Sequence, residues 1–147
     1  DCREQAWLNT GDLGFMDDDG QLYICGRTKD LIIVDGKNHY PQDIESAVLN
    51  LQAQIELTEA AVFEESGAIY FFAELGKKSL RQATQQYLTD LKYSIKETVT
   101  REHGLTLYQV ILLKTNRIPK TTSFKVQRQK LKHLYQSGRV QEMIIYE

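Results

Sequence analysis

Strand-forming residues flank a turn signal early in the chain. The stretch 22–25 (LYIC) is rich in strand formers, and residues 18–20 (DDG) supply a turn before it. We therefore predict a β-hairpin over residues 13–25. A second apolar run, 31–34 (LIIV), predicts a further strand that stops at the turn pair Asp35 and Gly36.

Two stretches have the period of an amphipathic helix. Pro41 suits a first helical turn, and the apolar residues that follow it lie on one face: Ile44, Ala47, Val48 and Leu51. A longer helix is predicted from Ser79, as N-cap, to the stop signal at His103 and Gly104. Its stripe consists of Leu80, Thr84, Tyr87, Leu88, Leu91, Ile95 and Val99.

The remaining apolar runs predict strands and one basic helix. Residues 60–63 and 69–75, separated by a polar linker that ends in glycine, predict an antiparallel pair, and 107–113 predicts another strand. A basic helix follows the Pro119 loop and ends at about 135–138. This order predicts an α+β fold, in which a β-hairpin precedes a small antiparallel sheet flanked by helices.

Composition describes a soluble globular domain. The 147 residues are 41% hydrophobic and 26% charged, with a net charge of −2, and no apolar run is long enough to span a bilayer. Cys2 and Cys25 lack metal-ligand spacing, so we expect no metal site in this chain and a reducing, cytoplasmic setting. Because the first residue is Asp1, we expect a part of a longer chain.

Positive charge is concentrated near the C-terminus. Residues 114–133 contain no acid and seven bases: Lys114, Arg117, Lys120, Lys125, Arg128, Lys130 and Lys132. Such a run either forms a solvated helix face or meets phosphate. No aromatic residues alternate with these bases, and the whole chain is acidic, so we predict no nucleic-acid binding.

Three short segments carry the chemical information: 10–14 (TGDLG), 26–30 (GRTKD) and 119–125 (PKTTSFK). Each alone is explained by a turn, a surface ion pair or a solvated lysine. In this order, however, they resemble the adenylate-forming superfamily of acyl- and aryl-CoA synthetases, luciferases, adenylation domains and fatty acyl-AMP ligases. The resemblance spans nearly the whole chain.

The resemblance implies a role for four residues. Asp12 would bind the ribose hydroxyls of ATP, and Arg27 would contact the nucleotide. Lys29 would be the hinge of a mobile lid, and Lys125 would reach the α-phosphate and the substrate carboxylate as the catalytic lysine. It also implies that residues 1–28 end a large N-terminal adenylation domain, which is the lid's partner, and that 29–147 form the C-terminal lid.

A further segment, 36–45 (GKNHYPQDIE), resembles the form found in fatty acyl-AMP ligases. Those enzymes activate a fatty acid with ATP and Mg²⁺ and pass the acyl group to the phosphopantetheine thiol of an acyl carrier protein. Two alternatives stay open: the lid of an acyl-CoA or aryl-CoA ligase, and a degenerate module that docks a carrier without catalysis. We expect this segment alone to be inactive and to bind no Mg²⁺, because most substrate contacts belong to the large domain.

One position departs from the family pattern. Phe124 stands where the family normally has a glycine before the lysine. If the position is left-handed, a phenylalanine there costs about 1–2 kcal/mol. If it is helical, the replacement is tolerated.

Overall fold

The computed structural model describes residues 8–51, 55–140 and 144–146, so Cys2 and residues 1–7 of the expected 1–28 segment lie outside the described residues. None of the described helices is both long and apolar enough to cross a membrane. The elements in chain order are β1 (Asp12–Met16), β2 (Leu22–Arg27), a 3-10 helix η1 (Thr28–Asp30), β3 (Ile32–Val34), β4 (Lys37–His39), α1 (Pro41–Leu49), β5 (Leu57–Glu65), β6 (Ala68–Leu75), α2 (Lys77–Arg81), α3 (Gln85–His103), β7 (Gln109–Lys114), α4 (Arg128–Gln136) and β8 (Ile144–Tyr146).

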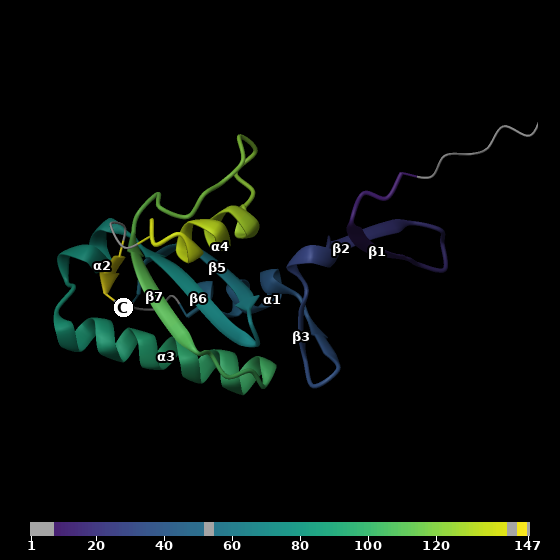
Figure 1. Ribbon diagram of the computed structural model, residues 1–147. Helices are drawn as coiled ribbons and strands as arrows, with labels where there is room; N and C mark the ends of the chain where they lie inside the picture. The colour runs from purple at the N-terminus through teal and green to yellow at the C-terminus, as the bar shows by residue number, and fades with distance from the viewer. Residues whose placement is uncertain (1–7, 52–54, 141–143, 147) are drawn as a thin grey trace, which may run out of the picture.

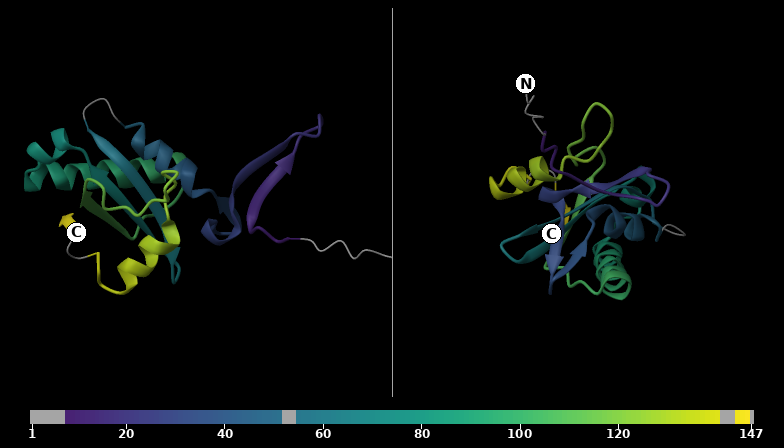
Figure 2. Two further views of the ribbon diagram at one scale, coloured as in Figure 1. Left: turned by 90° about the horizontal axis from the view of Figure 1, so that it is seen from above. Right: turned by 90° about the vertical axis from the view of Figure 1, so that its right-hand side faces the viewer.

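The predicted hairpin is β1 paired antiparallel with β2. Its turn is closed by the Asp17 carboxylate, which accepts hydrogen bonds from the backbone N–H groups of Asp19 (3.1 Å) and Gln21 (2.8 Å), while Gly20 has a φ of 77°. The hairpin projects away from the helices and the larger sheet (Figures 1 and 2). Its register places Asp12 opposite Arg27, at the end of the hairpin away from the turn.

The predicted strand at 31–34 does not simply stop at its turn pair. Asp35 and Gly36 have φ values of 50° and 74°, and they join β3 to β4, with Val34 opposite Lys37. Two successive positive φ values are typical of the type I′ turn that connects tight hairpins. The strand β4, which the apolar pattern does not predict, follows from this turn chemistry.

The larger sheet has the strand order β5-β6-β7-β8. The pairs β5/β6 and β7/β8 are antiparallel, but β6 and β7 run parallel. The long connection between β6 and β7 contains α3, and a helical crossover of this kind returns the chain to the same end of the sheet before the next strand begins. The predicted α+β class is confirmed, and this one parallel pair is the difference in detail.

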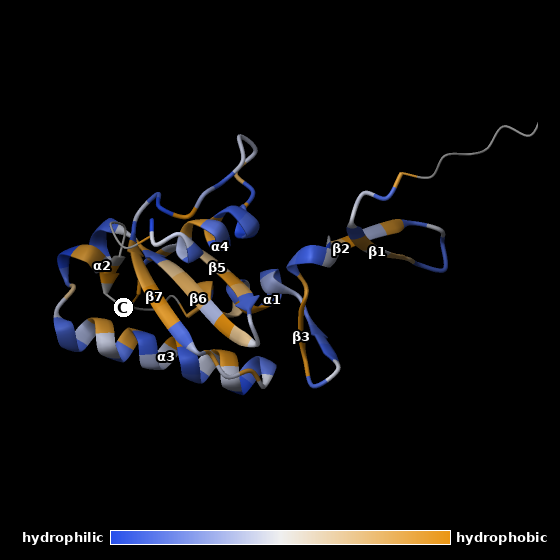
Figure 3. Cartoon of the chain, viewed as in Figure 1, coloured by the Kyte–Doolittle hydropathy of each residue, from blue (hydrophilic) through white to orange (hydrophobic). Residues whose placement is uncertain are grey.

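Helices cover both faces of this sheet. Alternate residues of β5 and β7 therefore enter two separate cores, which explains why both strands read as continuous apolar runs. One core lies under α1 and α3 and includes Ile44, Val48, Val62, Phe71, Leu91, Ile95, Val99, Val110 and Leu112. The other lies under α4 and includes Phe63, Phe72, Ile111, Leu113, Ile118 and Leu131. Figure 3 shows the apolar strands between helices whose outer surfaces are polar.

The long helix predicted from Ser79 is two helices, so that prediction is wrong at its start. Thr84 is the N-cap of α3, and its hydroxyl accepts a hydrogen bond from the backbone N–H of Tyr87 at 3.2 Å. Ser79 lies inside α2, is buried, and accepts from the backbone N–H of Glu56 at 2.8 Å. A serine that bonds outside its own helix is not a cap. The predicted end is confirmed, since Gly104 has a φ of 69°.

A buried ion pair joins α1 to α4. Only 6% of Glu45 and 8% of Arg128 are exposed. Arg128 donates to both carboxylate oxygens of Glu45, with Nε to Oε1 at 2.8 Å, and its Nη1 lies 3.7 Å from Oδ2 of Asp30. Glu45 also accepts from the backbone N–H of Val62 on the edge strand β5, at 2.9 Å. One carboxylate therefore fixes a helix, a strand edge and a second helix.

Burial and charge act against each other within this pair. Burial raises the pKa of the Glu45 carboxyl above its ordinary value, although the hydrogen bonds from Arg128 oppose that shift. For Arg128, burial acts to lower the pKa, but the hydrogen bonds and charge of Glu45 raise it overall. Each charge is thus tolerated in the core because of the other.

Removing one partner should be costly. We predict that Glu45→Gln lowers the free energy of unfolding by about 3 kcal/mol, because Arg128 is left buried with only Asp30 nearby. Glu65→Gln is the matched control, since Glu65 pairs with Lys132 at 2.6 Å near the surface, and its loss should be at most about 1 kcal/mol. Urea denaturation of the two variants measures the difference. Equal losses would show that the buried pair contributes no more than a surface one.

Candidate functional site

The first two predicted site residues meet at the base of the hairpin. Nε of Arg27 lies 3.3 Å from Oδ1 of Asp12, with 71% of the arginine side chain and 34% of the aspartate side chain exposed. The neighbouring backbone is held by bonds from Thr28 N to the Gly11 carbonyl (2.9 Å) and from Asp12 N to the Thr10 hydroxyl (3.2 Å). An ion pair this exposed is weak, so both groups are accessible to a ligand that supplies a better partner.

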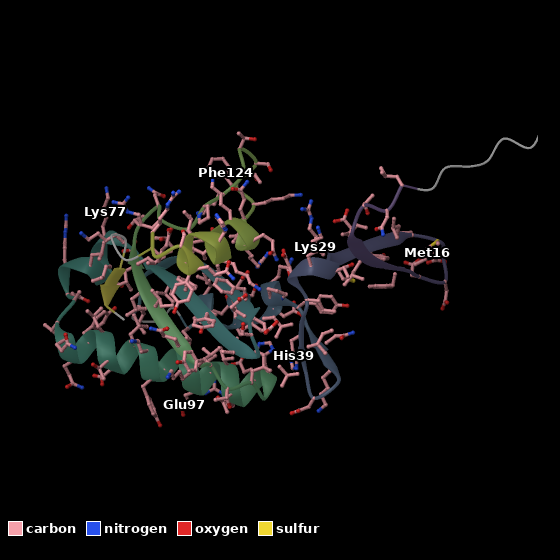
Figure 4. All side chains as sticks on the ribbon, in the orientation of Figure 1. Met16, Lys29, His39, Lys77, Glu97 and Phe124 are labelled. Carbon is pink, nitrogen blue, oxygen red and sulfur yellow. The ribbon has the colours of Figure 1, made fainter. Side chains whose placement is uncertain are left out.

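Lys29 lies in η1, between the hairpin and the rest of the chain (Figure 4). Its carbonyl oxygen accepts a hydrogen bond from Nε2 of Gln129 at 3.0 Å, and the same nitrogen lies 2.9 Å from Oδ1 of Asp30. Asp30 is further tied to α4 by its ion pair with Arg128. Helix α4 therefore clamps the C-terminal side of the predicted hinge.

Lys125 is presented by a closed loop, which we call the Lys125 loop and define as residues 115–127. Its neck is formed by an isolated β-bridge between Lys120 and Val126 and by the bond from Gln127 N to the Pro119 carbonyl at 2.8 Å. At the tip, Thr121 N donates to the Lys125 carbonyl (2.9 Å), and Lys125 N donates to the Thr121 hydroxyl (3.1 Å). Within the part of the chain that the structure describes, the Lys125 ammonium has no ion-pair partner.

Phe124 adopts the left-handed backbone conformation, with a φ of 61°. Of the two conformations considered for this position, the strained one is therefore present. The side chain is 82% exposed and lies at the outer tip of the Lys125 loop (Figure 4), so little packing offsets the strain. The loop nevertheless closes around it, since Phe124 N donates to the Thr121 carbonyl at 3.0 Å.

Arg27 and Lys125 line the same groove. This groove, of about 540 Å³, is bounded by Ile24, Cys25, Gly26, Arg27, Gln42, Lys125, Val126 and Arg128. Residues almost a hundred positions apart thus contribute two accessible cations to one concavity, and Asp12 joins it through Arg27. Lys29 is not among the lining residues. The arrangement suits an anionic ligand, with a carboxylate beside it to accept hydroxyl hydrogen bonds.

The structure divides the basic run at 114–133 into paired and exposed members. Lys120 pairs with Glu59 (2.8 Å), Arg128 with Glu45, and Lys132 with Glu65. The exposed members are Lys114, Arg117, Lys125 and Lys130. Neither alternative considered for the whole run applies to all of it, since part of it is structural.

Two groove residues escaped the sequence reasoning. Gln42 carries no distinctive pattern in the sequence. Arg128 was counted among solvated bases, although a signal for its burial exists: Pro41, Ile44, Glu45 and Val48 share one helical face, and all four are buried. An acid on an apolar face requires a buried cation.

Comparison with known proteins agrees with this geometry. The fold and the groove define the carboxy-terminal part of an adenylate-forming enzyme. A family model described as "Disco-interacting protein 2-like, AMP domain" matches residues 29–144. The chain belongs to this family.

Three related proteins extend the comparison. The medium-chain-fatty-acid–[acyl-carrier-protein] ligase JamA of Moorena producens is 38% identical over 130 residues, covering 85% of this chain and 21% of JamA. The long-chain-fatty-acid–AMP ligase FadD26 of Mycobacterium tuberculosis is 36% identical over 137 residues, covering 91% and 23%. A solved fatty acyl-adenylate ligase, from work on the Escherichia coli and Legionella pneumophila enzymes, has a TM-score of 0.76 at 31% identity, covering 93% and 23%. The chain spans about a fifth of the length of the curated relatives it matches.

The strained position yields a stability prediction. Phe124→Gly should raise the free energy of unfolding by up to about 1 kcal/mol, because relief of the left-handed strain exceeds the extra backbone entropy of glycine in the unfolded chain. Thr122→Gly, at an exposed loop position without a positive φ, should instead lower it by about 0.5–1 kcal/mol. Denaturant unfolding measures both. A loss in both variants would mean that the φ of Phe124 carries no strain.

Proposed function

We propose that this chain forms the C-terminal lid, with the last hairpin of the large domain, of a fatty acyl-AMP ligase. The complete enzyme activates a fatty acid with ATP to an acyl-adenylate and passes the acyl group to the phosphopantetheine thiol of an acyl carrier protein. The domain boundary lies between residues 28 and 29, and the setting is cytoplasmic. The observation that carries the proposal is the groove that Arg27 and Lys125 share. The names of JamA and FadD26 support the substrate and acceptor.

The groove suits a nucleotide in the complete enzyme. Asp12 would accept the ribose hydroxyl hydrogen bonds, Arg27 would contact the nucleotide, and Lys125 would face the α-phosphate. Magnesium prefers carboxylate and phosphate oxygens, and no carboxylate side chain lines the groove. We therefore assign Mg²⁺, which would neutralise charge on the triphosphate, to ATP and to residues beyond this chain.

In adenylation, the fatty-acid carboxylate attacks the α-phosphorus of ATP and pyrophosphate leaves. Negative charge accumulates on the phosphate oxygens in the transition state, so the protein acts mainly by positioning and charge stabilisation. The ammonium of Lys125 is a compact, flexibly held charge that suits this task. Withdrawing it afterwards would open a path for the carrier thiol.

The clamp on the hinge supports a particular pivot. Gln129 holds the Lys29 carbonyl and Asp30 against α4, so these groups would move with the lid. Rotation relative to the hairpin would then be concentrated in the backbone bonds before that carbonyl. Lys29 is the residue in which the two rigid parts meet.

A second candidate is the degenerate docking module, which the left-handed Phe124 favours. In that case the lid would keep its fold and its contact with a carrier protein while Lys125 contributed nothing to catalysis. The two candidates differ in the effect of removing one amine.

Lys125→Ala in the complete ligase is the decisive test. We predict that ATP–pyrophosphate exchange slows by about 10²–10³, the usual loss for one charge-stabilising donor. Transfer from preformed acyl-adenylate to the carrier should change much less. The control is Lys130→Ala, which removes an exposed lysine of α4 that does not line the groove. Adenylation as fast as in the control would favour the docking module.

The hinge is tested by Lys29→Pro, with Lys29→Ala as control. Proline fixes φ and removes an N–H, so we predict that overall turnover falls and that the two half-reactions slow unequally. Alanine keeps the backbone free and should leave both near their normal rates. Rapid-quench measurement of each half-reaction separates them. If both run normally in the proline variant, the pivot lies elsewhere.

A further inference from the structure

Glu74 is a fully buried acid that the proposed chemistry does not use. It lies on β6, between β5 and β7, with 0% of its surface exposed. Its neighbours along the strand, Ala73 and Leu75, are apolar core residues. A carboxylate in such a place needs several hydrogen-bond donors to offset its desolvation.

The donors come from the start of the Lys125 loop. Three consecutive backbone N–H groups point at this carboxylate: Asn116 donates to Oε2 at 3.0 Å, and Arg117 and Ile118 both donate to Oε1. The Thr58 hydroxyl lies 3.4 Å from Oε2. Successive N–H groups that converge in this way form a concave anion site, here filled by a side chain of the same protein.

The backbone at this anchor has an unusual shape. Asn116 has a φ of 61°, and the Thr115 hydroxyl donates to the Leu75 carbonyl at 2.7 Å. Ile118 then enters the core under α4. The loop therefore leaves β7 in a conformation that the bonds to Glu74 hold in place.

From this anchor, a continuous set of contacts reaches Lys125. Lys120 is paired with Glu59 at 2.8 Å and bridged to Val126, and Thr121 is bonded to Lys125 in both directions. A shift of residues 116–118 would thus be transmitted to the position of the lysine.

We propose that Glu74 is a positioning residue for Lys125, acting through the backbone of the Lys125 loop. This proposal rests on the proposed role of Lys125 in adenylation. Misplacing a reacting or stabilising group by about 1 Å can cost about 10² in rate. Glu74 touches neither substrate nor nucleotide in this scheme, so its influence should vanish when the lysine is absent.

A double-mutant cycle in the complete ligase tests this. Glu74→Gln keeps the size but turns an NH₂ group toward N–H donors, so adenylation should slow by about 10–100-fold. Transfer from preformed acyl-adenylate should stay within about twofold, and in the Lys125→Ala background Glu74→Gln should have no further effect. Multiplicative losses in the double variant, or an unaffected adenylation rate in Glu74→Gln, would overturn the proposal.

Two other substitutions define the anchor more closely. Thr115→Val removes the bond to Leu75 and should slow adenylation in the same lysine-dependent way, although less; it serves as the test if Glu74→Gln does not fold, and no slowing would then overturn the proposal. Thr58→Val removes a contact to Glu74 that does not involve the loop, and should leave adenylation unchanged.

The outcomes separate the two proposals. If Lys125→Ala alone has no effect on adenylation, the proposed function fails, and the role of Glu74 fails with it. If Lys125→Ala slows adenylation but Glu74→Gln does not depend on it, only the positioning role fails. Amide hydrogen exchange gives a readout besides activity: residues 116–118 should exchange faster in Glu74→Gln and unchanged in Thr58→Val, and equal protection in the glutamine variant would count against the anchor.

Discussion

The buried ion pair between Glu45 and Arg128 fixes the arrangement on which the candidate site depends. A buried charge without its partner costs several kcal/mol, so α1 and α4 cannot shift independently. Glu45 also holds the edge of β5 through Val62, and Arg128 reaches Asp30 beside the predicted hinge. Since Arg128 follows the Lys125 loop directly, the pair anchors the end of that loop, as Glu74 anchors its beginning. Two core carboxylates therefore frame the loop.

Much of the fold was predictable, because local chemistry and hydrophobic period agree in most segments. Pro41 begins α1, Gly104 ends α3, and the DDG turn closes the first hairpin. The failures have physical causes. Ser79 has the composition of a cap but bonds to Glu56 across space, and strand direction across β6 and β7 depends on a crossover that no local pattern records. The hairpin β3–β4 was recoverable from Asp35 and Gly36.

The site was predictable in a different sense. Asp12, Arg27, Lys29 and Lys125 came from a resemblance between short segments, and the structure supplies the geometry that brings Arg27 and Lys125 to one groove. The sequence could not separate Lys125 from the other bases around it, because pairing partners such as Glu45 and Glu59 lie far away along the chain. The buried acids themselves were visible, since both lie among apolar neighbours.

The exposed surface of the first hairpin has a consequence for how the chain folds. Phe15 and Tyr23 stack on each other with ring centroids 5.1 Å apart, yet both stay largely exposed, as do Met16, Leu22 and Ile24. A lone two-stranded hairpin is at best marginally stable in water. Its order is therefore conditional on a neighbouring surface, whereas the sheet and its covering helices form a cooperative unit of their own. The linking residues join two segments of very different local stability, so partial unfolding of this chain begins at the hairpin.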